Sequence, residues 1–315
     1  MDADVELAAQ LLKQGGLVAV PTETVYGLAA DATNPLAVRQ IFAAKGRPAD
    51  HPLIVHIHDA SALSLWAKDI PELAFKLAEA FWPGPLTLLL KKADHVSNVV
   101  TGGLDTIGLR VPAHPVFQKL LQTHQLAVAA PSANRYKKLS PTSARQVFHG
   151  MAGRIDAVLD GGDCALGLES TIVSLLGDRP QVLRAGPISA SALARVIGEP
   201  IAQPVTHQEK VSGNVDAHYQ PEKKLLCLPF DALVQKLSEA TQPLAVLHWT
   251  PLPDPQPACW HKFMPNHAQD YGQALYRELY HADQTDAEVI LIESPPTGEA
   301  WLAVHDRLSR AVSKD

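Results

Sequence analysis

The chain has 315 residues, of which 46% are hydrophobic and 19% are charged, and its net charge is −6. This composition disfavours extensive disorder, and the length favours two domains of ordinary size. The charge is uneven: residues 1–200 carry 18 basic and 18 acidic side chains, whereas residues 201–315 carry 9 and 15. The overall basic surface that is typical of nucleic-acid-binding proteins is therefore absent.

The first residues and the cysteines indicate in which cellular compartment the protein is expected. The first residues, MDADVELAAQLLKQ, are acidic and amphipathic, unlike a secretion signal. No apolar run approaches the roughly 20 residues that a membrane helix needs. Cys164, Cys227 and Cys259 are far apart and form no CxxC pair, which disfavours a zinc or disulfide framework. We expect a cytoplasmic protein.

Helical and extended patterns alternate along residues 1–200. In chain order they predict a helix over 4–14, a strand over 17–20, a helix over 35–45, a strand over 52–57, a helix over 71–82, strands over 86–91 and 106–111, a helix over 114–123, a strand over 126–130, a helix over 142–151, strands over 157–160, 170–176 and 181–184, and a helix over 189–197. Such interleaving indicates an α/β domain. The connection between the last two strands is too short for a crossover helix, so the sheet should be mixed.

The remainder of the chain predicts a linker and a second domain. Residues 201–225 are polar, contain prolines and lack periodicity, as in a linker or lid. Residues 226–315 predict a small α/β domain, with a strand over 244–249, a helix over 266–282, a strand over 287–294 and a helix over 298–312. The expected division is 1–200, 201–225 and 226–315.

Polar and cationic residues recur where strands end, which is where α/β sheets bind ligands. Lys45 and Arg47 flank a glycine after a predicted helix. They either complement the helix dipole or clamp a phosphate. Arg110 ends an otherwise apolar strand, so if buried it needs an anion. From the residues alone, a structural carboxylate and a substrate carboxylate are equally good partners for it.

The motifs that are missing narrow the chemistry. The sequence has no GxxxxGK[ST] loop, no GxGxxG fingerprint and no GxSxG elbow. Instead, strands are followed by Arg or Lys together with Ser or Thr. This pattern favours a polyanionic ligand held by many fixed donors, without a covalent nucleophile.

Six segments, in order and spacing, carry a resemblance to a known family. PTETVYGL, KGRP, GLRVPAHP, PSAN, STIV and VLRAGPI resemble the threonylcarbamoyl-AMP synthase family with its YrdC-type domain. HYQP at 218–221 and DRLSRA at 306–311 resemble the long form, which adds a linker and a C-terminal domain. The resemblance implies a YrdC-like twisted mixed sheet with flanking helices, and a small Rossmann-like α/β domain after the linker.

The resemblance also implies an activity. L-Threonine, bicarbonate or CO2, and ATP would give L-threonylcarbamoyladenylate and pyrophosphate, which makes the chain a nucleotidyltransferase. Mg2+ would accompany ATP, with no protein ligands to the metal expected. A separate transferase complex would pass the product to tRNA, forming threonylcarbamoyladenosine; direct tRNA binding is left open, and no membrane partner is expected.

The family's site residues transfer to matching positions. Lys45 and Arg47 would be catalytic. The threonine pocket would contain Thr24, His56, Arg110, Ala130 and Ser170. The ATP contacts would be Arg47, His51, Thr106, Ser132, Ser140, Arg184 and, from the linker, Tyr219. His51 stands where the family often has Asn, and VSGN at 211–214 replaces its usual Ser-Pro-Gly-Met.

Two other classes compete with this interpretation. An RNA-binding protein of the same fold would use Arg135, Lys137, Lys138 and Arg145, but the neutral charge of residues 1–200 disfavours it. A hydrogenase-maturation carbamoyltransferase has a related domain, but it carries CxxC elements that this chain lacks.

Overall fold

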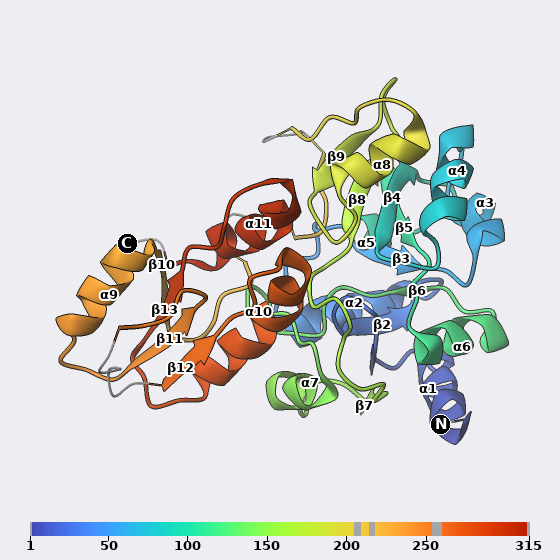
Figure 1. Cartoon of the computed structure of the whole chain (residues 1–315). Helices are drawn as coiled ribbons and strands as arrows, with labels where there is room; N and C mark the ends of the chain where they lie inside the picture. Colours follow the sequence, from blue (N-terminus) through green and yellow to red (C-terminus); the bar gives the residue numbers. More distant parts are fainter. Residues whose placement is uncertain (1, 205–208, 214–217, 254–259, 314–315) are drawn as a thin grey trace. The chain divides into compact units, whose positions relative to one another are not determined.

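The computed structural model describes residues 2–204, 209–213, 218–253 and 260–313 (Figure 1). The chain forms two compact units. The first contains residues 1–136, 141–165 and 169–214, and the second contains 137–140, 166–168 and 215–315. Among the described residues, no helix is long and apolar enough to cross a membrane.

A nine-stranded sheet organises the first unit, in the order β7-β1-β2-β6-β3-β5-β4-β8-β9. Its strands are β1 (Val18–Val20), β2 (Gly27–Asp31), β3 (Ile54–His56), β4 (Leu86–Lys91), β5 (Thr106–Arg110), β6 (Val128–Ala129), β7 (Ala157–Val158), β8 (Thr171–Ser174) and β9 (Gln181–Arg184). β3 pairs with β5 in parallel, whereas β4 pairs with β5, and β8 with β9, in antiparallel fashion. The predicted mixed sheet is confirmed.

Helices cover the two faces of this sheet unequally. The helices of the first unit are α1 (Asp2–Lys13), α2 (Pro35–Lys45), α3 (Leu63–Trp66), α4 (Glu72–Phe81), α5 (Asn98–Thr101), α6 (Pro115–His124), α7 (Ala144–Met151) and α8 (Ala190–Ile197). The larger core lies on one face and includes side chains of α2, α4, α7 and α8. On the other face, α1 and α6 pack on β1, β2 and β6 and form a smaller core (Figure 1). α6 also reaches β3, where the Phe117 ring lies 5.6 Å from the His56 ring, and the face of β5, β4, β8 and β9 is left to other residues.

Local sequence signals fix where α2 begins and ends. The Asn34 side chain accepts hydrogen bonds from the backbone of the first turn, and Pro35 occupies the first helical position. Gly46 adopts a left-handed conformation (φ 64°) and closes the helix. Lys45 therefore lies in the last turn of α2, and Arg47 is the first residue beyond the Gly46 cap.

The second unit contains a four-stranded parallel sheet in the order β10-β13-β11-β12. Its strands are β10 (Lys224–Leu228), β11 (Leu244–His248), β12 (Trp260–Phe263) and β13 (Val289–Glu293), and its helices are α9 (Phe230–Ser238), α10 (Ala268–Asp283) and α11 (Leu302–Ala311). This architecture agrees with the predicted small α/β domain.

The structure adds elements that the sequence did not predict. β2, β10, β12 and the helices α3, α5 and α9 were not expected. The predicted linker 201–225 is divided between the two units at residue 214, and its last two residues already belong to β10. Parts of it, 205–208 and 214–217, lie outside the described residues.

Candidate active site

Strand pleating brings the predicted polar residues to the face that α1 and α6 leave open. Alternate residues of a strand point to opposite faces. Val55 and Leu109 belong to the larger core, so their neighbours His56 and Arg110 point the other way. The pairing of β3 with β5 sets His56 beside Arg110. The register of β4 and β5, continued by one residue, places Thr87 on the other side of Arg110.

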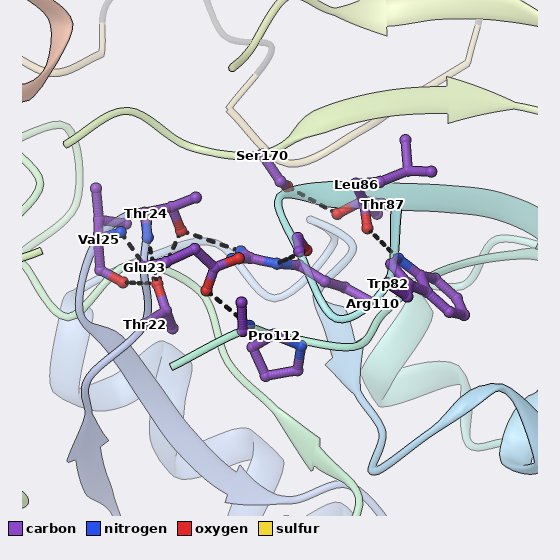
Figure 2. A network of polar contacts seen from close by, with 12 residues as sticks. Thr22, Glu23, Thr24, Val25, Trp82, Leu86, Thr87, Arg110, Pro112 and Ser170 are labelled. Carbon is purple, nitrogen blue, oxygen red and sulfur yellow. Dashed lines mark hydrogen bonds and ion pairs between the residues drawn. The ribbon is translucent and has the colours of Figure 1, made fainter. Parts of the chain in front are cut away.

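Arg110 is buried, with 4% of its surface exposed, and its guanidinium has three partners. Nη2 donates to the Glu23 carboxylate at 2.6 Å, Nη1 to Thr24 Oγ1 at 3.1 Å, and Nε to the Gly84 carbonyl at 3.2 Å (Figure 2). The other Glu23 oxygen accepts the backbone N–H of Ala113 at 3.0 Å. The sequence left two possible partners for Arg110, a carboxylate of the protein and a carboxylate of the substrate. The structure shows a carboxylate of the protein, that of Glu23. Three of the five guanidinium N–H groups are thereby used among the described residues.

The hydroxyls of the PTET turn have a defined direction. Thr22 Oγ1 donates to the Val25 carbonyl at 2.6 Å, so it acts as the acceptor toward Thr24 Oγ1, 2.8 Å away. Thr24 consequently donates to Thr22 while accepting from Arg110. Thr24 is 1% exposed, and its hydroxyl is fixed at the edge of the Arg110 guanidinium.

His56 is a neutral residue of the same row. Burial lowers the pKa of His56 well below its usual range, and the positive charge of Arg110 lowers it further. Its ring lies 5.6 Å from the ring of Phe117, which belongs to α6. Its Nδ1 is buried and has no hydrogen-bond partner among the described residues. A neutral imidazole offers one donor and one acceptor, so His56 can bind a polar group without adding charge.

Arg184 and Ser170 continue the row on the far side of β4. Arg184 donates from Nε to the Ser170 carbonyl and from Nη2 to Ser170 Oγ, both at 3.0 Å. Ser170 Oγ lies 2.7 Å from Thr87 Oγ1 (Figure 2). A chain of hydrogen bonds thus joins Arg184 to the strand that lies beside Arg110.

A β-bulge in β9 turns Arg184 toward this face. Val173 pairs with Val182, but Ile172 pairs with Arg184, so Leu183 is one extra residue on β9. Without the bulge, Arg184 would share a face with Val182, which lies in the larger core. Bulges commonly redirect a side chain in this way.

Lys45 is held by the loop that follows β6. Its ammonium donates to the backbone carbonyls of Ser132 and Asn134, each at 2.5 Å. Burial lowers the pKa of Lys45 well below its usual value, and the nearby charge of Arg47 acts in the same direction. Gly27 permits the close packing here, because a Cβ on it would lie 3.2 Å from Ala130 Cβ. These contacts bring Lys45 and Ser132 together.

Arg47 and His51 lie beside Pro52. Arg47 donates from Nη2 to the Pro52 carbonyl at 3.2 Å. Burial lowers the pKa of His51, and the charges of Arg47 and Lys210 lower it further. Thr106 is the first residue of β5 and pairs with Lys91 of β4.

Two predicted ATP contacts, Ser140 and Tyr219, belong to the second unit and are described within it. Ser140 is buried. Tyr219 has a left-handed backbone (φ 60°), and its ring is 1% exposed. The Tyr276 ring lies 5.7 Å from it and the Arg307 guanidinium 5.5 Å above it. The role of both residues in ATP binding stays a prediction.

Sequence reasoning missed three residues of this network. They are Glu23, which pairs with Arg110, Thr87, which contacts Ser170, and Ser212, whose carbonyl accepts from Arg184 Nη1 at 2.9 Å. The requirement of a buried Arg110 for an anion could have pointed to Glu23, the acid within the PTET motif. No comparable signal singles out Ser212.

These contacts indicate an α/β protein that binds an anionic small molecule on one face of its sheet. Two guanidinium groups, a buried threonine and a neutral histidine lie on one sheet face, and a second buried threonine, Thr24, lies at the edge of one guanidinium. Such a site suits an anionic small molecule and needs no covalent nucleophile.

Comparisons with known proteins identify the family. Residues 10–186 match the family model of Sua5, YciO and YrdC, described as "Telomere recombination", and residues 188–313 match "Threonylcarbamoyl-AMP synthase, C-terminal domain". The threonylcarbamoyl-AMP synthases of Pyrococcus abyssi and Bacillus subtilis are each 38% identical to this chain, over 98% of it and 93% of the relative. The crystal structure of P. abyssi Sua5 complexed with L-threonine matches with a TM-score of 0.90, covering 98% of this chain and 95% of that one at 38% identity. The chain belongs to the threonylcarbamoyl-AMP synthase family.

Proposed function

We propose that the chain converts L-threonine, bicarbonate or CO2, and ATP into L-threonylcarbamoyladenylate and pyrophosphate. The observation that carries this proposal is the row formed by His56, Arg110, Thr87 and Arg184 on one face of the sheet, with Thr24 at its edge. The P. abyssi relative whose structure contains L-threonine supports the choice of amino acid.

Arg110 receives the threonine carboxylate in this proposal. Glu23 and Gly84 fix the plane of the guanidinium, and two N–H groups stay available for a carboxylate among the described residues. Glu23 also compensates the charge of Arg110 before substrate binds, so the buried arginine is tolerated. Thr24, His56, Ala130 and Ser170 form the rest of the threonine pocket.

The nucleotide binds along the neighbouring cations. Arg47, His51, Thr106, Ser132, Ser140, Arg184 and Tyr219 are the proposed ATP contacts, with Lys45 supplying charge near the phosphates. Because Lys45 is buried and Arg184 is held by three hydrogen bonds, their donors are already oriented when ATP arrives. Preorganised donors stabilise phosphoryl charge without reorganisation during the reaction.

The proposed reaction depends more on holding the two substrates close together than on covalent catalysis. The threonine amine adds to CO2 and loses a proton, which gives a carbamate. A carbamate oxygen then attacks the α-phosphorus of ATP, the new O–P bond forms, and the bond to the pyrophosphate oxygen breaks. Holding the two substrates side by side makes the second step effectively unimolecular. Carbamates decompose in water, so exclusion of solvent favours the product.

Mg2+ accompanies ATP in the proposed reaction. Among the described residues no cluster of three His, Cys, Asp or Glu side chains could hold a metal ion. Glu23, the acid beside Arg110, already has a partner on each oxygen. This donor set fits a metal that is held by the phosphates and water of Mg–ATP, where it offsets phosphate charge.

The product is a reactive acyl donor, so a second enzyme is expected to use it. A mixed anhydride with AMP is an activated acyl donor, so a separate transferase would move the threonylcarbamoyl group to tRNA. We propose that the chain works in the cytoplasm and releases its product to that transferase.

The test is pyrophosphate release by pure protein with Mg–ATP. We expect release that requires both threonine and bicarbonate, together with formation of threonylcarbamoyl-AMP detectable by mass spectrometry. Absence of release with all substrates present would refute the proposal. An RNA-binding role would instead give an RNA affinity that falls steeply with salt.

A further inference from the structure

Residues 209–213 pack at a defined place on the first unit. Val211 is buried against Leu89, Ile172 and Leu183, on the open face of the sheet. This apolar cluster is separate from the core under α1 and α6. The segment is therefore anchored on the same face that carries the proposed substrate contacts.

Ser212 makes two hydrogen bonds from this seat, to different parts of the proposed ATP site. Its carbonyl accepts from Arg184 Nη1 at 2.9 Å. Its hydroxyl donates to the Pro52 carbonyl at 2.8 Å, and the same carbonyl accepts from Arg47 Nη2 at 3.2 Å. One residue thus connects Arg184 with the turn that carries Arg47 and His51, although 160 residues separate it from Pro52.

The backbone around Ser212 supports a turn at this point. Gly213 has a φ of 84°, in the left-handed region that favours glycine, and it redirects the chain directly after Ser212. Lys210, on the other side, is exposed and adds positive charge near His51. Ser212 is half-buried and directly follows the buried Val211.

We infer that Ser212 is a positioning residue that latches the linker onto the nucleotide site, through its hydroxyl on the Pro52 carbonyl and its own carbonyl on Arg184. This inference rests on the proposed function. The latch holds residues 209–213 over the apolar cluster and fixes Arg184 from a third side. ATP then meets an arginine that already has its final orientation, and solvent has less access to the nucleotide.

Ser212→Ala tests the hydroxyl, because it removes the bond to Pro52 and keeps the carbonyl bond to Arg184. Loss of one hydrogen bond of ordinary strength should raise the KM for ATP by about fivefold. The KM for threonine and kcat should change less than about twofold, since a positioning defect at the nucleotide mainly weakens its binding. Ser212→Thr retains a hydroxyl and should restore the KM for ATP.

Limited trypsin digestion gives a readout that does not depend on the reaction. Lys210 directly precedes Val211, so cleavage after Lys210 reports how often the segment leaves its seat. We expect several-fold faster cleavage in Ser212→Ala than in the unsubstituted protein, with unchanged thermal stability. A non-hydrolysable ATP analogue should slow this cleavage in the unsubstituted protein more than in the variant.

Ser238→Ala is the matched control. Ser238 also donates its hydroxyl to a backbone carbonyl, that of Gln235 at 2.7 Å, but it lies on α9 of the second unit. It should leave the KM for ATP and the cleavage after Lys210 unchanged.

Each other outcome overturns the latch. An unchanged KM for ATP in Ser212→Ala would do so, whatever the cleavage rate. A lower KM would mean that the segment competes with ATP instead of holding it. If the unsubstituted protein released no pyrophosphate, the proposed function would fail, while the digestion experiment would still decide whether Ser212 holds the segment.

Discussion

The strand ends of the two units use buried charge in opposite ways. In the second unit, Glu293 ends β13 and is 2% exposed. Its Oε2 accepts the backbone N–H groups of Trp249 and Thr250, each at 2.8 Å, and its Oε1 accepts Thr250 Oγ1 at 2.6 Å. In the first unit, Arg110 uses three of its five N–H donors on partners among the described residues.

This difference shows how a buried charged residue that only supports the fold can be distinguished from one that can bind a ligand. Both residues are buried and hydrogen-bonded, so burial does not distinguish them. Glu293 joins two adjacent turns within one small sheet. Arg110 draws its partners from the PTET turn and the turn before β4, and it still has donors left. Incomplete internal use of a buried, fixed charge indicates a ligand site.

The largest effect is expected for Arg110→Lys. Lysine keeps the charge opposite Glu23, so the fold should survive, but it cannot present a planar fork to a carboxylate. The KM for threonine should rise about 100-fold. The KM for ATP should change less than about threefold. Pyrophosphate release at varied threonine measures both, and unchanged threonine dependence would refute the assignment of Arg110.

Arg47→Ala should weaken binding of an ATP analogue about tenfold, because a charge-assisted contact to phosphate is lost. Arg135→Ala, an exposed arginine of the first unit, is the control and should leave the affinity unchanged. Calorimetric titration provides the measurement. Equal affinities of the Arg47 variant and the unsubstituted protein would exclude the phosphate clamp.

Two variants, Glu293→Gln and Glu23→Gln, test the comparison between the two units directly. In Glu293→Gln, the negative charge that strengthens three hydrogen bonds is lost, so the free energy of unfolding should fall by about 2 kcal/mol while the kinetics stay the same. In Glu23→Gln, the fixed plane of Arg110 is loosened, so the KM for threonine should rise about fivefold. Urea unfolding and pyrophosphate release separate the two effects. Equal kinetic defects in both variants would remove the distinction between the two sites.

A further expected effect is a pH dependence of stability. The folded pKa of His56 is lowered by burial and by Arg110, whereas in the unfolded chain it is about 6.5. Below pH 6.5 the unfolded state binds a proton that the folded state rejects. The stabilisation is complete above that pH and is lost as the pH falls toward the folded pKa.

His56→Asn isolates this contribution from those of other groups. Between pH 7.5 and 5.5 the unsubstituted protein should lose about 1.4 kcal/mol more of its unfolding free energy than the variant. Urea titrations at the two pH values measure the difference. The same loss in both proteins would show that His56 is not held neutral in the fold.

The sequence predicted the elements whose periodicity or capping is strong. α2 agrees with its predicted range, because Asn34, Pro35 and Gly46 mark both ends. β2 was missed because Gly-Leu-Ala-Ala-Asp lacks β-branched residues, and it is a strand because β1 and β6 pair with it on both sides. β12 was missed because its side chains are largely exposed and its pattern is not apolar.

The site could be predicted where motifs follow strands, and not where contacts cross the chain. Arg110 and Arg184 could be singled out because each ends a predicted strand, whereas His56 was assigned only through the resemblance to the family. Glu23 and Ser212 were missed because their partners are 87 and 28 residues away, at Arg110 and Arg184, and only the folded sheet brings them together.

The extra residue in β9 makes the pairing of two strands decide on which face of the sheet the charge of Arg184 lies. Replacement of Leu183 by another apolar residue should be tolerated, since its contribution is to the small cluster around Val211. If β9 kept all its residues but paired with β8 in regular alternation, the Arg184 guanidinium would point into the larger core beside Val182. An uncompensated charge there would be costly, so the bulge matters more for the position of Arg184 than the identity of Leu183 does.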